Sequence, residues 1–182
     1  MLDTVLGLPI HPLIVHATVV MVPVATLLVG LCAVAPATRR QLAWPAVLAC
    51  LVACVTVAGA ALSGGPLEAR VGGNALIHHH SQLAKLLVAW VLVMSAAAVA
   101  LAYVDWYRGG TAVAGWIRVP PKTVRALAPA SIGRLIYARW LLPTVVALSL
   151  VTALGTLVQV VLVGHSGAQA AWSGVGGAAG GR

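Results

Sequence analysis

Six histidines are the residues whose type and spacing could do chemistry in this chain. Two of them begin an apolar run in the stretch "LPIHPLIVHATV", three stand together before another apolar run, and one follows the last. They are His11, His16, His78, His79, His80 and His165. Imidazoles buried in a membrane protein ligate metal ions, ligate haem or relay protons.

Carboxylate chemistry is excluded as the main activity, because the chain has only three acidic residues. Asp105 is expected on the side opposite the histidines, and a Ser-His-Asp triad lacks its acid unless Glu68 serves. The sequence contains neither a nucleophile elbow nor a phosphate-binding loop. We therefore expect a non-catalytic redox or accessory subunit more than a stand-alone enzyme.

The composition places these histidines in a membrane protein. Apolar residues make up 61% of the 182 positions and charged residues 8%, against about 25% charged residues in soluble proteins. A membrane-spanning helix needs about 20 apolar residues, and four such runs are predicted, over residues 12–35, 43–63, 81–105 and 140–163. We predict an all-α, integral-membrane four-helix bundle over residues 1–168. The glycine-rich tail, residues 169–182, is expected to be flexible, and no repeat of fixed period is found.

The net charge of +8 indicates topology more than a nucleic-acid partner, because the basic residues lie beside helix ends instead of forming an aromatic-interleaved patch. Eight of them flank the connections between the first and second runs and between the third and fourth. They are Arg39, Arg40, Arg108, Arg118, Lys122, Arg125, Arg134 and Arg139. The positive-inside rule makes that side cytoplasmic and both termini extracytoplasmic, as in a multi-pass protein of a bacterial inner membrane.

This topology puts all six histidines on the extracytoplasmic side. His16 and His80 lie deepest in their predicted helices, so they are the first candidates for axial ligands of one or two b-type haems. His11 and His165 are further candidates. Arg70 and Lys85 are the cations on the same side that could pair with haem propionates.

Two alternatives stay open. In the first, His16, His80 and His165 bind copper or zinc, both of which accept imidazole ligands. In the second, the protein is a cofactor-free accessory or scaffold subunit whose histidines are interfacial.

The segments "LPIHPLIVHATVVMVPVA" and "GHSGAQAAW" resemble a bacterial integral-membrane family, a domain of unknown function with a signature close to HPLxVHFP. The resemblance implies four helices and, by analogy with four-helix b-type cytochromes, haem binding. The family's paired N-terminal histidines match His11 and His16, and the histidine that opens its third helix fits His80. Its final G-H-x-G-A pattern matches Gly164, His165, Gly167 and Ala168. Ala17 and Thr18 replace the family's aromatic residue and proline, which changes the expected pocket wall.

These observations predict a membrane electron-transfer subunit that binds b-type haem near the extracytoplasmic face. A single haem at one face cannot carry charge across a bilayer by itself. We therefore expect other membrane subunits of a respiratory, quinol-linked or cytochrome-linked complex as partners.

Overall fold

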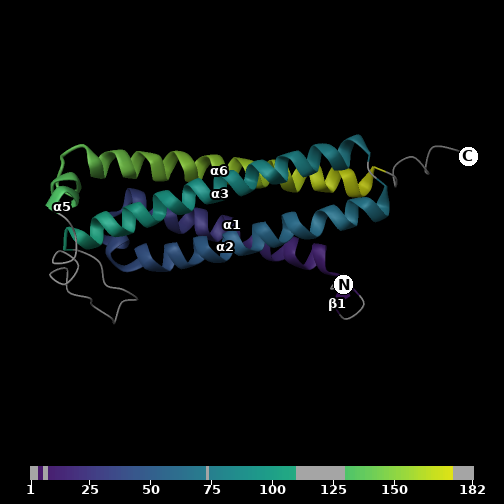
Figure 1. The fold of residues 1–182 in the computed structure, drawn as a ribbon, viewed down its shortest axis with the longest axis horizontal. Helices are drawn as coiled ribbons and strands as arrows, with labels where there is room; N and C mark the ends of the chain where they lie inside the picture. The colour runs from purple at the N-terminus through teal and green to yellow at the C-terminus, as the bar shows by residue number, and fades with distance from the viewer. Residues whose placement is uncertain (1–3, 6–7, 73, 110–129, 174–182) are drawn as a thin grey trace, which may run out of the picture.

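A computed structural model describes residues 4–5, 8–72, 74–109 and 130–173. Four long helices lie side by side in a bundle (Figure 1), and each is long and apolar enough to cross a membrane. They are α1 (Ile10–Val34), α2 (Pro36–Val71), α3 (Ala75–Tyr107) and α6 (Leu141–Trp172), with the short α5 (Ala130–Ile136) before α6. Before α1, the two-residue strands β1 (Thr4–Val5) and β2 (Leu8–Pro9) pair antiparallel. The predicted all-α class with four membrane-length helices is confirmed.

The helices form a closed ring in the order α1, α2, α3, α6. Helix α1 packs against α2 and α6, and α3 packs against the same two helices, so α1 and α3 lie diagonally opposite each other. Consecutive helices run in opposite directions, and α1 begins at the end of the bundle where α6 ends (Figure 1). We call α1 with α2 the first hairpin and α3 with α6 the second hairpin.

Helix α2 is longer than predicted. It begins at Pro36, and Ala35 alone separates it from α1. Proline suits the first turn of a helix because a backbone N–H at that position would have no partner within the helix. It does not stop at the Ser-Gly-Gly segment but continues through Pro66 to Val71. The chain leaves the helix at Gly72, whose φ of 77° favours glycine. The predicted flexible tail lies mostly outside the described residues, which end at position 173.

The two hairpins are built on one residue pattern. An offset of 69 positions (80 − 11) superimposes His11 on His80 and pairs buried residues of α1 with buried residues of α3. The pairs are Thr18 with Leu87, Val22 with Val91, Ala25 with Met94, Val29 with Ala98, Cys32 with Leu101 and Ala33 with Ala102. An offset of 103 positions (166 − 63) aligns α2 with α6 in the same way. It pairs the buried residues Ala49 with Thr152, Cys50 with Ala153, Ala53 with Thr156 and Val57 with Val160, and it pairs the partly buried Ser63 with the buried Ser166.

The two offsets differ because the hairpins have unequal connections. A single residue, Ala35, separates α1 from α2, whereas residues 108–140 separate α3 from α6. Because the long connection is present in only one hairpin, equivalent residues are not separated by a constant number of positions. A search of the sequence for a repeat of fixed period therefore does not find this pattern. In space, the shared pattern relates the hairpins by an approximate two-fold axis along the bundle.

The packed core does not reach both ends of the bundle. Toward one end it stops at a layer formed by Thr18, Val57, Leu87 and Val160, each at most 7% exposed. His11 and His80 each lie seven residues beyond this layer, about 10 Å farther at 1.5 Å per residue. We call this the histidine end. Among the residues described beyond the layer, Ser166 alone is buried.

Candidate functional site

His11 and His80 occupy equivalent positions in the two hairpins, and both rings are partly buried. The Nδ1 atom of His11 lies 2.9 Å from the Oγ atom of Ser63 on α2. The Nδ1 atom of His80 lies 3.0 Å from the Oγ atom of Ser166 on α6. Each imidazole is therefore hydrogen-bonded to a serine on the other helix of its own hairpin.

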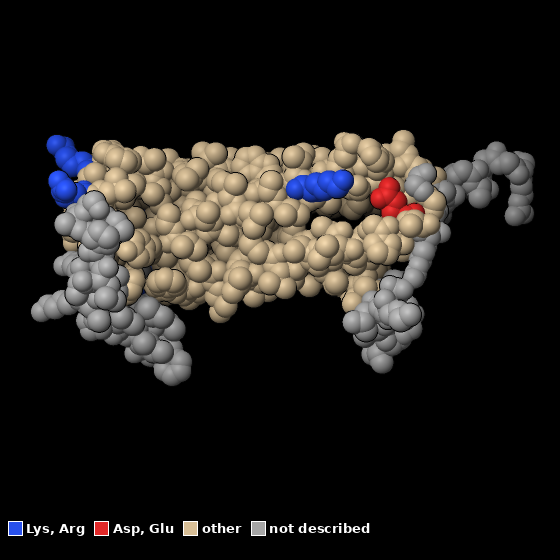
Figure 2. Space-filling model, viewed as in Figure 1, with Lys and Arg blue, Asp and Glu red and all other residues tan. Residues whose placement is uncertain are grey.

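His11 and His80 come from the diagonally opposite helices α1 and α3, at the same end of the bundle. Figure 2 shows the surface hollowed in this half of the molecule, beside its isolated blue side chain. The site is therefore a pair of partly buried imidazoles beyond the last core layer, one in each hairpin.

The other four histidines are exposed at the same end. The ring of His16 hydrogen-bonds to the main-chain oxygen of Pro12, one turn earlier in its own helix, at 2.6 Å. His78 contacts the side chain of Gln82 at 3.4 Å. His165 directly precedes the buried Ser166 but is itself exposed. The structure thus places His11 and His80 in equivalent, partly buried positions and leaves His16 and His165 exposed.

A three-histidine metal site is not assembled. Within the part of the chain that the structure describes, no three His, Cys, Asp or Glu side chains gather closely enough to hold a metal ion. His16, His80 and His165 are therefore not brought together as copper or zinc ligands. Lys85 is exposed on α3, five residues after His80. The side chain of Arg70 lies outside the described residues.

A second polar cluster lies at the opposite end, which we call the arginine end after Arg39, Arg40, Arg108, Arg134 and Arg139. Arg39 was expected to be a loop charge, but its side chain is only 4% exposed and pairs with Asp105. The Nε of Arg39 donates to the main-chain oxygen of Cys32 at 2.7 Å, and its Nη2 donates to that of Ala33 at 3.1 Å. The guanidinium thereby caps the end of α1, a structural use of the charge.

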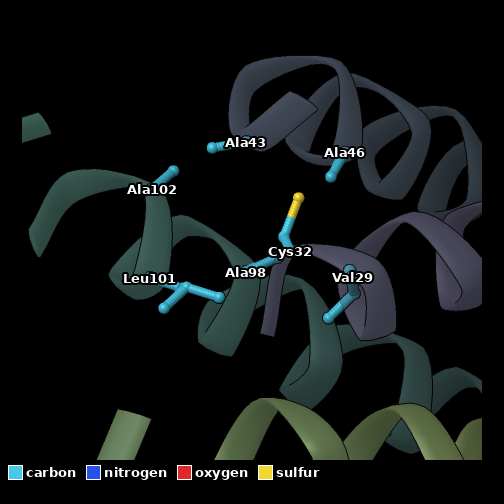
Figure 3. Close-up of a pocket in the computed structure, with 7 residues that line it drawn as sticks. All are labelled: Val29, Cys32, Ala43, Ala46, Ala98, Leu101 and Ala102. Carbon is cyan, nitrogen blue, oxygen red and sulfur yellow. The ribbon is translucent and has the colours of Figure 1, made fainter. Parts of the chain in front are cut away.

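A small cavity lies in the core above this cluster. It measures about 10 Å³, which is close to the space of one water molecule. Figure 3 shows its lining, which comes from α1, α2 and α3. The residues are Val29, Cys32, Ala43, Ala46, Ala98, Leu101 and Ala102. The cavity is distant from the histidines, so it belongs to the packing of the core and not to the site.

Sequence reasoning missed Ser63 and Ser166. Each is followed by glycine and lies near the end of an apolar helix, in "LSGG" and in "HSGA". The recurrence of Ser-Gly at equivalent places was the signal that could have identified them. The serine of the "GHSGA" segment, and not its histidine, contacts the partly buried ring.

Comparison with known protein families, with curated proteins and with solved structures finds no match to this chain. Its site is therefore interpreted from its own geometry.

Proposed function

We propose that this protein is a membrane electron-transfer subunit in which His11 and His80 ligate one b-type haem between the two hairpins. The observation that carries the proposal is the pair itself. Two partly buried imidazoles lie on diagonally opposite helices at the unpacked end of an apolar bundle. Four-helix bundles hold cofactors in this way, with ligands from facing helices.

The imidazoles of His11 and His80 are suitable ligands for haem. Imidazole is a standard axial ligand of haem iron. Histidine ligands usually donate their other ring N–H to a nearby acceptor, and here each Nδ1 has a serine within hydrogen-bonding distance. Beyond the last core layer, Ser166 alone is buried among the described residues, which supports a ligand site between the hairpins.

When bound, haem would supply a one-electron iron couple. His11 and His80 would hold this group through their imidazole nitrogens. The apolar layer of Val57, Leu87 and Val160 would exclude water from one side of the site. Lys85 is the described cation nearest in sequence to the pair, and we propose that it binds a propionate.

The proposal includes an orientation and a partner. The excess of basic residues at the arginine end supports a cytoplasmic location for that end, in the inner membrane of a bacterium. The histidine end and both termini would then be extracytoplasmic. A haem confined to that face needs another membrane subunit, of a respiratory or quinol-linked complex, to complete electron transfer.

The test is a reduced-minus-oxidised spectrum of the protein purified in mild detergent after haem-replete expression. We expect a b-type α-band in the wild type and its loss in both His11→Ala and His80→Ala. The controls are His16→Ala and His165→Ala, which change exposed histidines at the same end and should keep the band. Loss of the band in His16→Ala but not in His11→Ala would disprove the assigned pair.

Absence of an α-band in the wild type would refute the haem proposal. Metal analysis of the same sample then separates the alternatives. Stoichiometric copper or zinc would indicate a metal-binding protein, and a colourless, metal-free protein that still assembles with other subunits would indicate a scaffold.

A further inference from the structure

The two histidine rings rest on the same dipeptide in the two hairpins. Ser63 and Gly64 lie beside His11, and Ser166 and Gly167 lie beside His80. A Cβ atom added at Gly64 would come within 3.4 Å of the Cε1 atom of His11, and one added at Gly167 within 3.1 Å of the same atom of His80. The absence of a side chain at each glycine lets the imidazole lie directly on the backbone of the neighbouring helix.

The direction of each histidine–serine hydrogen bond follows from the other bond of the serine. A hydroxyl carries one hydrogen and can also accept. The Oγ of Ser63 donates to the main-chain oxygen of Gly59 at 2.8 Å, and the Oγ of Ser166 donates to that of Val163 at 3.0 Å. We assign the single hydrogen of each hydroxyl to this carbonyl, so that the serine accepts from the ring.

The proton of each neutral imidazole therefore lies on Nδ1. In this tautomer the Nε2 atom carries the free lone pair. Both hairpins thus hold an imidazole with the same nitrogen available as a ligand.

We propose that Ser63 and Ser166 are positioning residues that fix His11 and His80 as Nδ1–H tautomers and direct both Nε2 lone pairs to one ligand on the two-fold axis. The identity of that ligand rests on the proposed function, whereas the tautomers do not. If the serines only helped the helices to pack, replacing them would leave the ring protonation unchanged.

The tautomers are measured on protein without haem, labelled with ¹⁵N in its histidine rings. The ring signals are assigned from His11→Ala and His80→Ala samples, at a pH where the imidazoles are neutral. We expect protonated Nδ1 and unprotonated Nε2 in both residues. Ser63→Ala should raise the Nε2–H population of His11 alone, and Ser166→Ala that of His80 alone.

The matched control is Ser149→Ala, which removes another buried serine of α6 whose hydroxyl bonds to Val145 of its own helix. This variant should leave both histidines unchanged. Wild-type rings that are mainly Nε2–H, or serine variants without effect on them, would overturn the proposal.

The haem-loaded protein provides a second readout. The Nδ1–H bond makes an axial imidazole a stronger donor to iron, so both serine variants should keep the α-band and shift the reduction potential upward, while Ser149→Ala should not. Fixed tautomers in a protein that binds no haem would refute the proposed function and leave the positioning role intact. A bound haem with variable tautomers would support the proposed function and refute the positioning role of the serines.

Discussion

The guanidinium of Arg39 lies 3.7 Å from the carboxylate of Asp105 in the interior of the arginine end. Arg39 belongs to the first turn of α2 and Asp105 to the last turn of α3, while the same guanidinium bonds to the final carbonyls of α1. One buried side chain therefore connects three of the four long helices.

Replacing Arg39 by alanine leaves Asp105 buried without its partner and uncaps α1. Removal of one member of a buried ion pair destabilises proteins by about 3–5 kcal/mol. We expect Arg39→Ala to fall in this range in reversible unfolding monitored by circular dichroism in detergent. Arg40→Ala, which removes the adjacent exposed arginine, should change the free energy of unfolding by less than about 0.5 kcal/mol. Equal effects of the two variants would show that the ion pair between Arg39 and Asp105 does not contribute to stability.

Gly155 permits the contact between α6 and Trp90 of α3. A Cβ atom at position 155 would lie 2.3 Å from Cζ3 of the indole, which is far inside contact distance. Gly155→Ala should therefore destabilise the bundle by about 1–3 kcal/mol through overpacking. Gly164→Ala is the matched control, since it lies on the same helix and nothing is near its added methyl group. It should be neutral or slightly stabilising, because alanine favours a helix over glycine.

Gln159 makes an interhelical hydrogen bond from a buried polar face of α6 that also carries Ser149, Thr152 and Thr156. Its Nε2 atom donates to the main-chain oxygen of Leu83 on α3 at 2.9 Å. By contrast, Ser149 and Thr152 donate to carbonyls of their own helix. We expect Gln159→Leu to lower the free energy of unfolding by about 0.5–1.5 kcal/mol. Thr152→Val should have a smaller effect in the same assay, and the opposite order would contradict this assignment.

The glycines beneath the rings should differ in their tolerance of alanine. The added methyl group would meet His80 at 3.1 Å from Gly167, but His11 at 3.4 Å from Gly64. We expect Gly167→Ala to reduce haem content more than Gly64→Ala, as measured by the ratio of haem to protein after identical purification. A greater loss in Gly64→Ala would mean that the ring contacts do not control binding.

The orientation can be tested with single cysteines in a variant that lacks Cys32, Cys50 and Cys54. His165→Cys and Arg139→Cys introduce thiols at exposed positions of the two ends. A membrane-impermeant maleimide should label the first in intact spheroplasts and the second only after permeabilisation. Labelling in the reverse pattern would place the histidine end in the cytoplasm.

The fold was largely predictable from hydropathy, because membrane-length apolar runs leave few other structures. The bounds of the helices were less predictable. The Ser-Gly-Gly-Pro segment of α2 reads as a helix end, yet the helix continues to Val71. Arg39 reads as a loop charge because hydropathy does not reveal that Asp105, far away in sequence, pairs with it.

The site was predicted only in part. The clustering of histidines at one end follows from the order of the helices, and His80, which the sequence favoured, is partly buried. Depth in the helix favoured His16 over His11, but depth does not determine which face of a helix meets its neighbours. Five residues of helix turn His16 away from His11, and the ring that meets Ser63 is the shallower one.

The unequal connections of the two hairpins have a mechanical consequence. At the arginine end, α1 and α2 meet within one residue and Arg39 ties them to α3, so the helices have little freedom to separate there. Small changes of angle at this anchored base become larger displacements at the rim that carries the imidazoles. The bundle is thus anchored at the arginine end, and a ligand bound between the hairpins would enter or leave at the histidine end.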